Sequence, residues 1–328
     1  MHLTRSVFLL SLFAAGSSAV SVSTAAVEAP YPSRPIRFVM PYPAGGTIDT
    51  TGRLVAQRLS EATGQQVVVD NRTGAGGTLG TELGAKAPPD GYTIVMGGTG
   101  TLAISPALGR PLGYDPLKDF APITLIATTP YVLVAHPSVP AKTVRELIEL
   151  AKSEPGKLNY ASGGSGSAPH LIGEMFRSRA GVNIVHIPYK GSTPAKIDLV
   201  AGRVQLLFTG IPPVASEIRN GTLRALGVTS AKRTSTLPDV PTIAESGVRG
   251  FDVSPWFGVL APAKTPAAIV DRLNTLTVGV LRNPSLRERL GREGVDVVGD
   301  SPREFEAFIR REMAQWAKAV RDSGAKVE

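Results

Sequence analysis

A pattern of buried strand, glycine-rich turn and amphipathic helix recurs along this chain and constrains its fold more than any other feature. In its first copy, from Arg37 to Asn71, an apolar run at residues 38–40 precedes a segment whose apolar residues recur at helical spacing. Further copies begin near Gln66, Tyr92 and Leu158. Strands that alternate with helices favour a parallel sheet covered by helices on both faces. The sequence therefore predicts an α/β protein.

The pattern restarts after a proline-containing connection at residues 109–122, which predicts two lobes with a cleft between them. The total of 328 residues is also enough for two domains. We expect the chain to cross between the lobes near Pro130–Val132 and again near Val253–Trp256. The resulting assignment gives residues 27–130 and 252–328 to the first lobe and residues 131–251 to the second, each a mainly parallel sheet flanked by helices.

The first 26 residues have the layout of a secretory signal peptide. Arg5 provides a basic start, the apolar run from Val7 to Ala15 is too short to span a bilayer, and small residues follow up to Ala26. We expect cleavage after Ala26. The chain contains no cysteine, so disulfides, thiolate zinc sites and a cysteine nucleophile are excluded. An exported protein without disulfides fits a bacterial periplasm better than secretion from a eukaryotic cell.

The net charge of +8 raises the question of nucleic-acid binding. The basic residues are scattered, however, with Lys232–Arg233 and Arg310–Arg311 as the longest clusters, and aromatic residues are not interleaved with them. We interpret the charge as a solvated basic surface with a general attraction for anions, and we expect no nucleic-acid partner.

Three glycine-rich turns follow predicted strands in the first lobe, at residues 43–46, 73–80 and 97–100. Such turns meet at the carboxyl edge of a parallel sheet, where ligands bind. Glycine lets the backbone approach a ligand, and the helix starts that follow present N–H groups without partners, which suits an anion. One such turn could be a tight connection only, but three at one edge favour binding. Asp49 is expected to cap the first helix.

In the second lobe, residues 161–170 (ASGGSGSAPH) bring hydroxyl groups to a helix start and therefore suit a carboxylate. A serine nucleophile at Ser165 or Ser167 is the competing interpretation. The G-x-S-x-G pattern is absent, however, and His170 lies too close on the same helix start to act as the base. His170 itself remains open as a ligand contact or as a packing residue of the first turn.

Other chemistries lack their residue patterns. The segment TGAGGTLG misses the spacing of a dinucleotide fingerprint, and the chain has no phosphate-binding loop of the G-x-x-x-x-G-K type. The histidines after the signal peptide occur singly, without the spacing of a metal site. We therefore expect no cofactor, no metal ion and no catalytic residue.

Several motifs then occur in the order in which one family carries them, among them MPYPAGGTIDT, PPDGYTIVMGG, HIPYKGSTPA and LPDVPTIAESGV. From about Tyr31 to the C-terminus the chain resembles the solute-binding proteins of tripartite tricarboxylate transporters, also called the Bug family. The resemblance implies a two-lobed periplasmic binding protein of type II that closes on a small carboxylate. Membrane transporter subunits are the implied partners, and we expect the protein to be a monomer.

The resemblance also implies where the ligand binds. Its carboxylate would lie between residues 42–49 of one lobe and residues 162–170 of the other, with residues 191–195 at the rim. Thr209 stands where many members have Asp, which counts against an amino-acid ligand unless Thr209 only packs behind the cleft. The residues expected to bind substrate are Tyr42, Ala44, Gly45, Gly46, Thr47, Asp49, Ala75, Gly76, Ser162, Gly163, Ser165, Ser167, His170 and Thr209.

Two other functions stay open on the sequence alone. One is an exported α/β hydrolase that uses Ser165 or Ser167. The other is a binding protein that serves a sensor kinase instead of a transporter.

Overall fold

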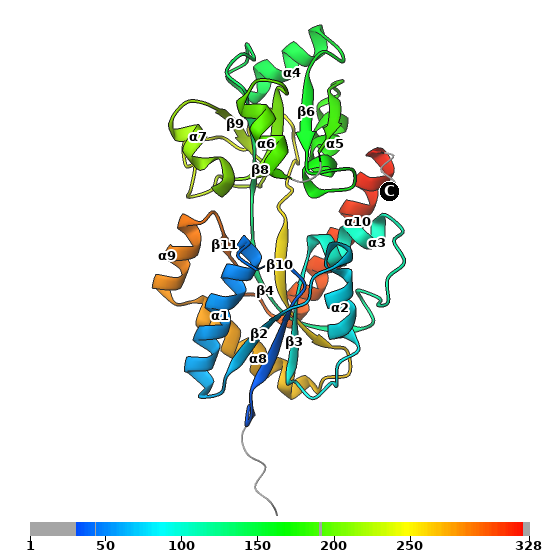
Figure 1. Cartoon of the computed structure of the whole chain (residues 1–328), viewed down its shortest axis with the longest axis vertical. Coiled ribbons are helices and arrows are strands. Elements are labelled where there is room, and N and C mark those ends of the chain that lie inside the picture. Colours follow the sequence, from blue (N-terminus) through cyan, green and yellow to red (C-terminus); the bar gives the residue numbers. More distant parts are fainter. Residues whose placement is uncertain (1–30, 43, 190–191, 324–328) are drawn as a thin grey trace, which may run out of the picture. The chain divides into compact units, whose positions relative to one another are not determined.

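The strands form two sheets, one of six strands and one of five, in the part of the chain that the computed structural model describes (Figure 1). That part comprises residues 31–42, 44–189 and 192–323. The predicted signal peptide, Pro43 in the first glycine-rich turn and Gly191 at the predicted rim lie outside it. Within these ranges, no helix combines the length and the apolar character needed to cross a membrane.

The first sheet has the strand order β11-β4-β10-β3-β1-β2. β1 pairs in parallel with β2 and β3, whereas β10 lies between β3 and β4 and is antiparallel to both; β11 is antiparallel to β4. Its strands are β1 (Ile36–Met40), β2 (Val67–Asn71), β3 (Thr93–Gly98), β4 (Phe120–Thr128), β10 (Trp256–Pro262) and β11 (Asp296–Val297).

The second sheet has the strand order β7-β6-β8-β5-β9. β6 pairs in parallel with β7 and β8, whereas β5 lies between β8 and β9 and is antiparallel to both. Its strands are β5 (Tyr131–Ala135), β6 (Asn159–Ser162), β7 (Val185–Pro188), β8 (Leu206–Gly210) and β9 (Arg224–Val228).

These directions refine the prediction of mainly parallel sheets. β1 to β4 share one direction in the first sheet, and β6 to β9 share one direction in the second, but one opposed strand is inserted into each group. The inserted strands β10 and β5 are those that receive the chain from the other sheet. A strand that enters from the other sheet starts at the edge where its neighbouring strands end. It is therefore antiparallel to them.

Helices pack against both sheets, as alternating elements require. α4 shows why one of them starts where it does: the Thr143 side chain accepts a hydrogen bond from the Glu146 N–H, which caps the helix. The α-helices are α1 (Thr47–Thr63), α2 (Thr78–Ala85), α3 (Ser105–Ala107), α4 (Val144–Ser153), α5 (Ala168–Ala180), α6 (Ser192–Val200), α7 (Ala215–Arg219), α8 (Ala267–Leu281), α9 (Pro284–Arg292) and α10 (Pro302–Ser323). Shorter helical segments are η1 (Ala75–Gly77), η2 (Gly100–Ile104) and η3 (Pro212–Val214).

The chain passes from the first sheet to the second after Thr128 and returns before Trp256. The two crossing segments are joined to each other, because the Thr129 N–H donates to the Pro255 carbonyl at 2.7 Å and the Thr129 hydroxyl donates to the same oxygen at 3.1 Å. The Val253 N–H donates to the Thr229 carbonyl at 2.9 Å. The connection between the sheets is therefore a hydrogen-bonded pair of strand extensions.

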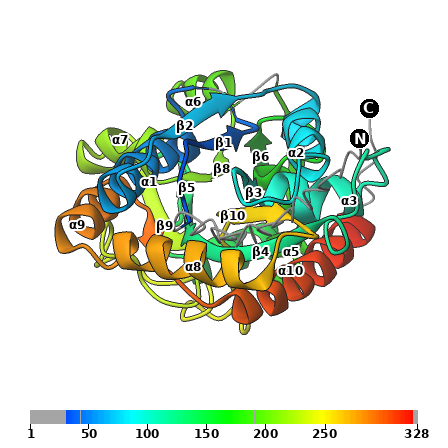
Figure 2. The same cartoon turned by 90° about the horizontal axis from the view of Figure 1, so that it is seen from below.

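The last helix packs on both sheets. In its first half Phe305 and Ile309 belong to the core of the first sheet, which includes Trp256. In its second half Trp316 and Ala319 belong to the core of the second sheet. Figure 2 shows α10 beside α8 along β4, in agreement with the contacts among these three elements. Residues 302–323, expected to belong to the first lobe alone, thus contact both cores.

We predict that replacing glycine by alanine changes the free energy of unfolding in opposite directions at two positions, one in β10 of the first sheet and one in α8, which packs on that sheet. In Gly258→Ala the new Cβ would lie 2.4 Å from Phe305 Cζ and 2.6 Å from the Thr124 carbonyl oxygen, so the packed layers must shift. We expect this overpacking to lower the free energy of unfolding by about 1–3 kcal/mol. The measurement is urea denaturation monitored by circular dichroism.

Gly279→Ala in α8 is the matched control, because beyond its chain neighbours and the nearby backbone of its own helix the new Cβ would meet no atom within 4 Å. Alanine should stabilise this exposed helical position by about 0.5–1 kcal/mol. Equal unfolding midpoints for the two variants would contradict the tight packing of β10 against α10.

Candidate functional site

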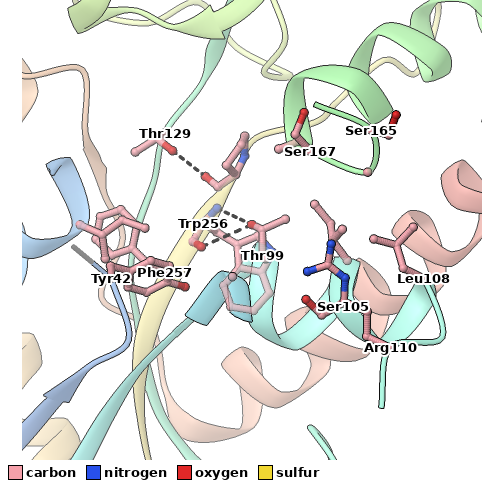
Figure 3. A pocket seen from close by; sticks show the side chains of 17 residues that line it. Tyr42, Thr99, Ser105, Leu108, Arg110, Thr129, Ser165, Ser167, Trp256 and Phe257 are labelled. Carbon is pink, nitrogen blue, oxygen red and sulfur yellow. Dashed lines mark hydrogen bonds between the residues drawn. The ribbon is translucent and has the colours of Figure 1, made fainter. Parts of the chain in front are cut away.

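A cavity of about 310 Å³ lies where the ends of both sheets meet (Figure 3). Its walls come from the first sheet and its helices, from the turn that begins α5, and from the crossing segments. The lining residues are Tyr42, Ile48, Gly76, Thr99, Gly100, Ile104, Ser105, Leu108, Arg110, Thr129, Ser165, Gly166, Ser167, Ala168, Pro255, Trp256 and Phe257.

The cavity combines apolar walls with hydroxyl groups. Ile104, Leu108 and Trp256 present hydrocarbon or aromatic surface, whereas the polar groups are side chains such as Ser105 and Ser167. Cavities of this composition bind small molecules, since apolar walls hold the body of a ligand and a few polar groups orient it. The ligand that fits has a hydrocarbon body and oxygen-containing ends.

Hydrogen bonds fix the β10 wall of the cavity. The Trp256 N–H donates to the Thr99 hydroxyl oxygen at 2.7 Å, and this hydroxyl donates in turn to the Trp256 carbonyl at 3.3 Å. The Trp256 indole N–H donates to Glu312 of α10 at 2.9 Å. Trp256 is therefore held through both its backbone and its ring.

The turn before α5 forms the wall contributed by the second sheet. The Ser167 hydroxyl donates to the Gly164 carbonyl at 2.7 Å, and no side chain caps the first turn of α5. None of the described residues accepts a hydrogen bond from the N–H groups of Ser165 and Ala168. Because both residues line the cavity, these donors and the positive end of the helix favour an anion there.

His170 lies behind this turn and does not line the cavity. Its Nδ1 accepts the Gly166 N–H at 3.0 Å, and its ring stacks on His186 at a centroid distance of 3.9 Å. His186 Nε2 lies 2.6 Å from the Ser162 hydroxyl oxygen. Burial lowers the pKa of His170, and burial followed by the charge of His170 lowers the pKa of His186 to about 4. Both rings are therefore neutral at pH 7, and they hold the shape of the turn together with Ser162.

Asp49 has a different position from the expected N-cap. The residue before α1 is Gly46, and Asp49 lies inside the first turn, where it is 1% exposed. Its carboxylate accepts hydrogen bonds from the Gly45 N–H at 2.9 Å, from Arg53 Nε at 3.0 Å and from Asn71 Nδ2 at 2.8 Å. The prediction of an N-cap is wrong because glycine in extended geometry takes that position, and Asp49 instead ties the turn to α1 and to the end of β2.

The other predicted substrate-binding residues divide by location. Tyr42, Gly76, Ser165 and Ser167 line the cavity. Thr209 is buried on β8, and Gly163 is half-buried in the turn before α5; neither lines the cavity. Four residues of the first turn and one of η1 are exposed and do not line it: Ala44, Gly45, Gly46, Thr47 and Ala75.

Several lining residues were not predicted. Thr99 lies within the third glycine-rich turn, and Trp256 lies at the predicted crossing. The sequence therefore indicated both segments, although it did not single out these two side chains. Arg110 follows α3 in a connection without periodic pattern, and nothing local in the sequence indicates that it lines a cavity. Two of the buried polar atoms without a hydrogen-bond partner among the described residues belong to lining residues: the Tyr42 hydroxyl and Arg110 Nε.

Burial raises the pKa of Tyr42 to about 12. The Thr101 hydroxyl lies nearby and offsets this rise in part, although it is outside hydrogen-bonding geometry. Tyr42 is therefore a neutral donor that a ligand or a water molecule in the cavity can satisfy. Among the residues that the structure describes, no group of three or more His, Cys, Asp or Glu side chains is placed to hold a metal ion.

We predict that Asp49→Asn destabilises the protein by about 1–3 kcal/mol at pH 7, because an amide cannot accept from all three donors. Burial would raise the pKa of Asp49, but hydrogen bonds from Arg53, Asn71 and the Gly45 N–H together lower it below its usual value. A lowered pKa means that this stabilisation is present above the unfolded pKa and is lost as the pH falls through the folded one.

Thermal unfolding of wild type and Asp49→Asn from pH 7 to pH 3 measures this dependence. The difference between the two proteins should be largest at neutral pH and should shrink below about pH 4. A difference that stays constant over this range would show that the Asp49 charge is unimportant.

Comparison with known proteins agrees with this architecture. Residues 51–325 match the family described as "Tripartite tricarboxylate transporter family receptor" (TctC). The UPF0065 protein in the tcbD-tcbE intergenic region of Pseudomonas sp. (strain P51) is 41% identical over 291 residues, which cover 88% of this chain and 86% of that protein. The protein BugT of Bordetella pertussis is 37% identical over 334 residues and is matched over 100% of both chains.

Solved structures show the same fold. R. palustris Rpa4515 with adipate has a TM-score of 0.77 at 40% identity, covering 90% of this chain and 100% of that one. The periplasmic binding protein BugD has a TM-score of 0.73 at 37% identity, covering 91% and 100%. MatC from Rhodopseudomonas palustris with bound malate has a TM-score of 0.72 at 32% identity, covering 88% and 100%. The predicted α/β fold of a two-lobed periplasmic binding protein is confirmed, and the chain belongs to the Bug family of tripartite tricarboxylate transporter receptors.

Proposed function

We propose that this protein captures a small carboxylate in the cavity between its two sheets and delivers it to the membrane subunits of a tripartite tricarboxylate-type transporter. The observation that carries the proposal is the uncapped start of α5 at this cavity, beside the first turn of α1. Ile48 in the first turn of α1 and Ala168 at the start of α5 both line it, and neither helix has a side-chain cap. The positive end of α5 and its free N–H groups favour an anion here, whereas the Asp49 carboxylate already offsets the positive end of α1.

The identity of bound ligands in related proteins supports a carboxylate. Rpa4515 was solved with adipate and MatC with malate, and both are more than 30% identical to this chain. Both ligands have carboxylate ends joined by a short carbon chain. The cavity has the matching combination of N–H and hydroxyl donors with apolar walls at Ile104, Leu108 and Trp256.

Binding without catalysis fits the two cavity serines better than hydrolysis does. The Ser167 hydroxyl donates a hydrogen bond to the Gly164 carbonyl, and the nearby His170 accepts one from the Gly166 N–H through Nδ1. A serine nucleophile needs a base within hydrogen-bond reach. Ser165 and Ser167 have no such base among the described residues, so we assign them to ligand binding.

We further propose that the protein works in the periplasm as a monomer, after removal of the signal peptide near Ala26. Its lobes would comprise residues 27–130 with 252–328 and residues 131–251, as the sequence predicts. BugD, which shares the fold, is a periplasmic binding protein. The chain contains no cysteine and so needs no oxidative folding step in that compartment.

We predict that small organic acids stabilise the protein and change its tryptophan fluorescence. At about 100 times its dissociation constant, a ligand should add about 2.7 kcal/mol to the free energy of unfolding. Trp256 lines the cavity, so its emission should respond to the ligand. A thermal-shift screen of organic acids, sugars, amino acids and nucleotides, followed by fluorescence titration, measures both effects.

Trp316→Phe supplies the control, because the chain has two tryptophans and Trp316 is buried in the second core. This variant should keep the fluorescence response, whereas Trp256→Phe should lose it. Stabilisation by sugars or nucleotides alone would contradict the proposed function.

We also predict that ligand binding draws the two sheets together about the crossing segments. Because the chain has no cysteine, a Gln57→Cys, Ile197→Cys double variant can be spin-labelled at two exposed sites on α1 and α6. The distance between the labels should shorten and its distribution should narrow when ligand is added. The ligand used must first be shown by calorimetry to bind. An unchanged distance between the labels in its presence would then reject closure.

A further inference from the structure

Arg110 is the one charged side chain among the described residues that line the cavity. It follows α3, and its backbone N–H donates to the Ser105 carbonyl at 3.3 Å. In Figure 3 its side chain reaches into the space below the turn that carries Ser165 and Ser167. A guanidinium therefore faces the cavity from the first sheet, opposite the helix start contributed by the second.

The charge of Arg110 has no counter-ion in the part of the chain that the structure describes. Its Nε is buried and has no hydrogen-bond partner there. Burying an unpaired donor of a charged group costs free energy, so such groups are normally satisfied. Since the residue lines a ligand cavity, an anionic ligand is the partner that would complete it.

Other arginines in this protein show what a structural role looks like. Arg224 is also half-buried, and its Nη1 donates to the carbonyls of Val139 and Ala141 at 3.2 and 2.8 Å. Arg37 is paired with Asp70 at 2.6 Å. Arg110 has neither kind of contact for its guanidinium among the described residues, which argues against a role limited to holding the fold.

The surroundings of Arg110 leave room for a ligand group. A Cβ on Gly76 would lie 3.2 Å from Arg110 Nη1, so the absence of a side chain there keeps this side of the guanidinium open. A Cβ on Gly166 would lie 2.9 Å from Leu108 Cδ1, which places the α5 turn directly against the segment that leads to Arg110. The N–H donors of that turn and the guanidinium thus border one cavity, with Leu108 and Ile104 as apolar surface.

We propose that Arg110 is a specificity-determining residue that binds a second anionic group of the ligand. The inference rests on the proposed function, in which the first carboxylate is held at the start of α5. Arginine suits a carboxylate because its planar fork donates two parallel hydrogen bonds. The ligand is then an aliphatic dicarboxylate, and a ligand with an ammonium group at that end is repelled.

The test compares acids that differ only at the second end: adipate with hexanoate, and succinate with butyrate. Calorimetry on the wild type identifies which of the two dicarboxylates binds more tightly. This dicarboxylate should bind at least tenfold more tightly than the monocarboxylate of the same chain length. In Arg110→Met this dicarboxylate should bind about ten- to a hundredfold more weakly, while binding of the monocarboxylate changes by less than about threefold. Arg249→Met, which removes an exposed charge outside the cavity, should behave like the wild type.

Arg110→Lys keeps the positive charge but loses the planar fork, so it should retain part of the preference for the dicarboxylate over the monocarboxylate. If Arg110→Met is unstable, Arg110→Lys takes its place in the comparison. Equal affinity of the wild type for both members of each pair would overturn the role of Arg110 and leave the proposed function intact. An equal loss of mono- and dicarboxylate binding in Arg110→Met, with a native circular dichroism spectrum, would also overturn it. Failure of the wild type to bind any carboxylate would overturn both.

Discussion

The hydrogen-bonded crossing between the two sheets is the constraint on which the cavity depends. Because β10 and β5 each enter a sheet at the edge where the strands on either side of them end, the carboxyl edges of both sheets must face the crossing. The glycine-rich turns and helix starts lie at those edges. Thr129 joins the two crossing segments through Pro255, and Thr99 fixes Trp256 beside them. The same bonds that connect the sheets thus place one wall of the cavity.

A half-buried carboxylate connects this wall to the last helix. Glu312 of α10 accepts the indole N–H of Trp256 at 2.9 Å and that of Trp316 at 3.0 Å, both through Oε2. Burial raises the pKa of Glu312, and these two hydrogen bonds partly offset the rise. Trp256 lines the cavity, whereas Trp316 belongs to the core of the second sheet. The Glu312 carboxylate therefore joins a residue of the cavity wall to a residue of the second core.

The elements of this fold could be predicted from the sequence because strand and helix periodicities are local. The insertion of β10 and β5 against their neighbours could not, since it depends on how a distant segment returns. The site shows the same division. The second and third glycine-rich turns line the cavity through Gly76, Thr99 and Gly100, whereas residues 44–46 of the first turn do not. Asp49 was placed wrongly, and Arg110 was missed because its connection has no periodic pattern. Side-chain placement in such connections depends on long-range packing that a sequence pattern does not report.

The proposed site divides recognition between groups that can change during evolution and groups that cannot. N–H donors at the start of α5 belong to the backbone, so a substitution other than proline leaves the donor group itself in place. They suit a carboxylate but do not read the rest of the molecule. Discrimination must then come from side chains such as Arg110, whose replacement leaves the start of α5 in place. Thr209 is buried on β8 away from the cavity, so its side chain is a weaker candidate for this role than the sequence had indicated.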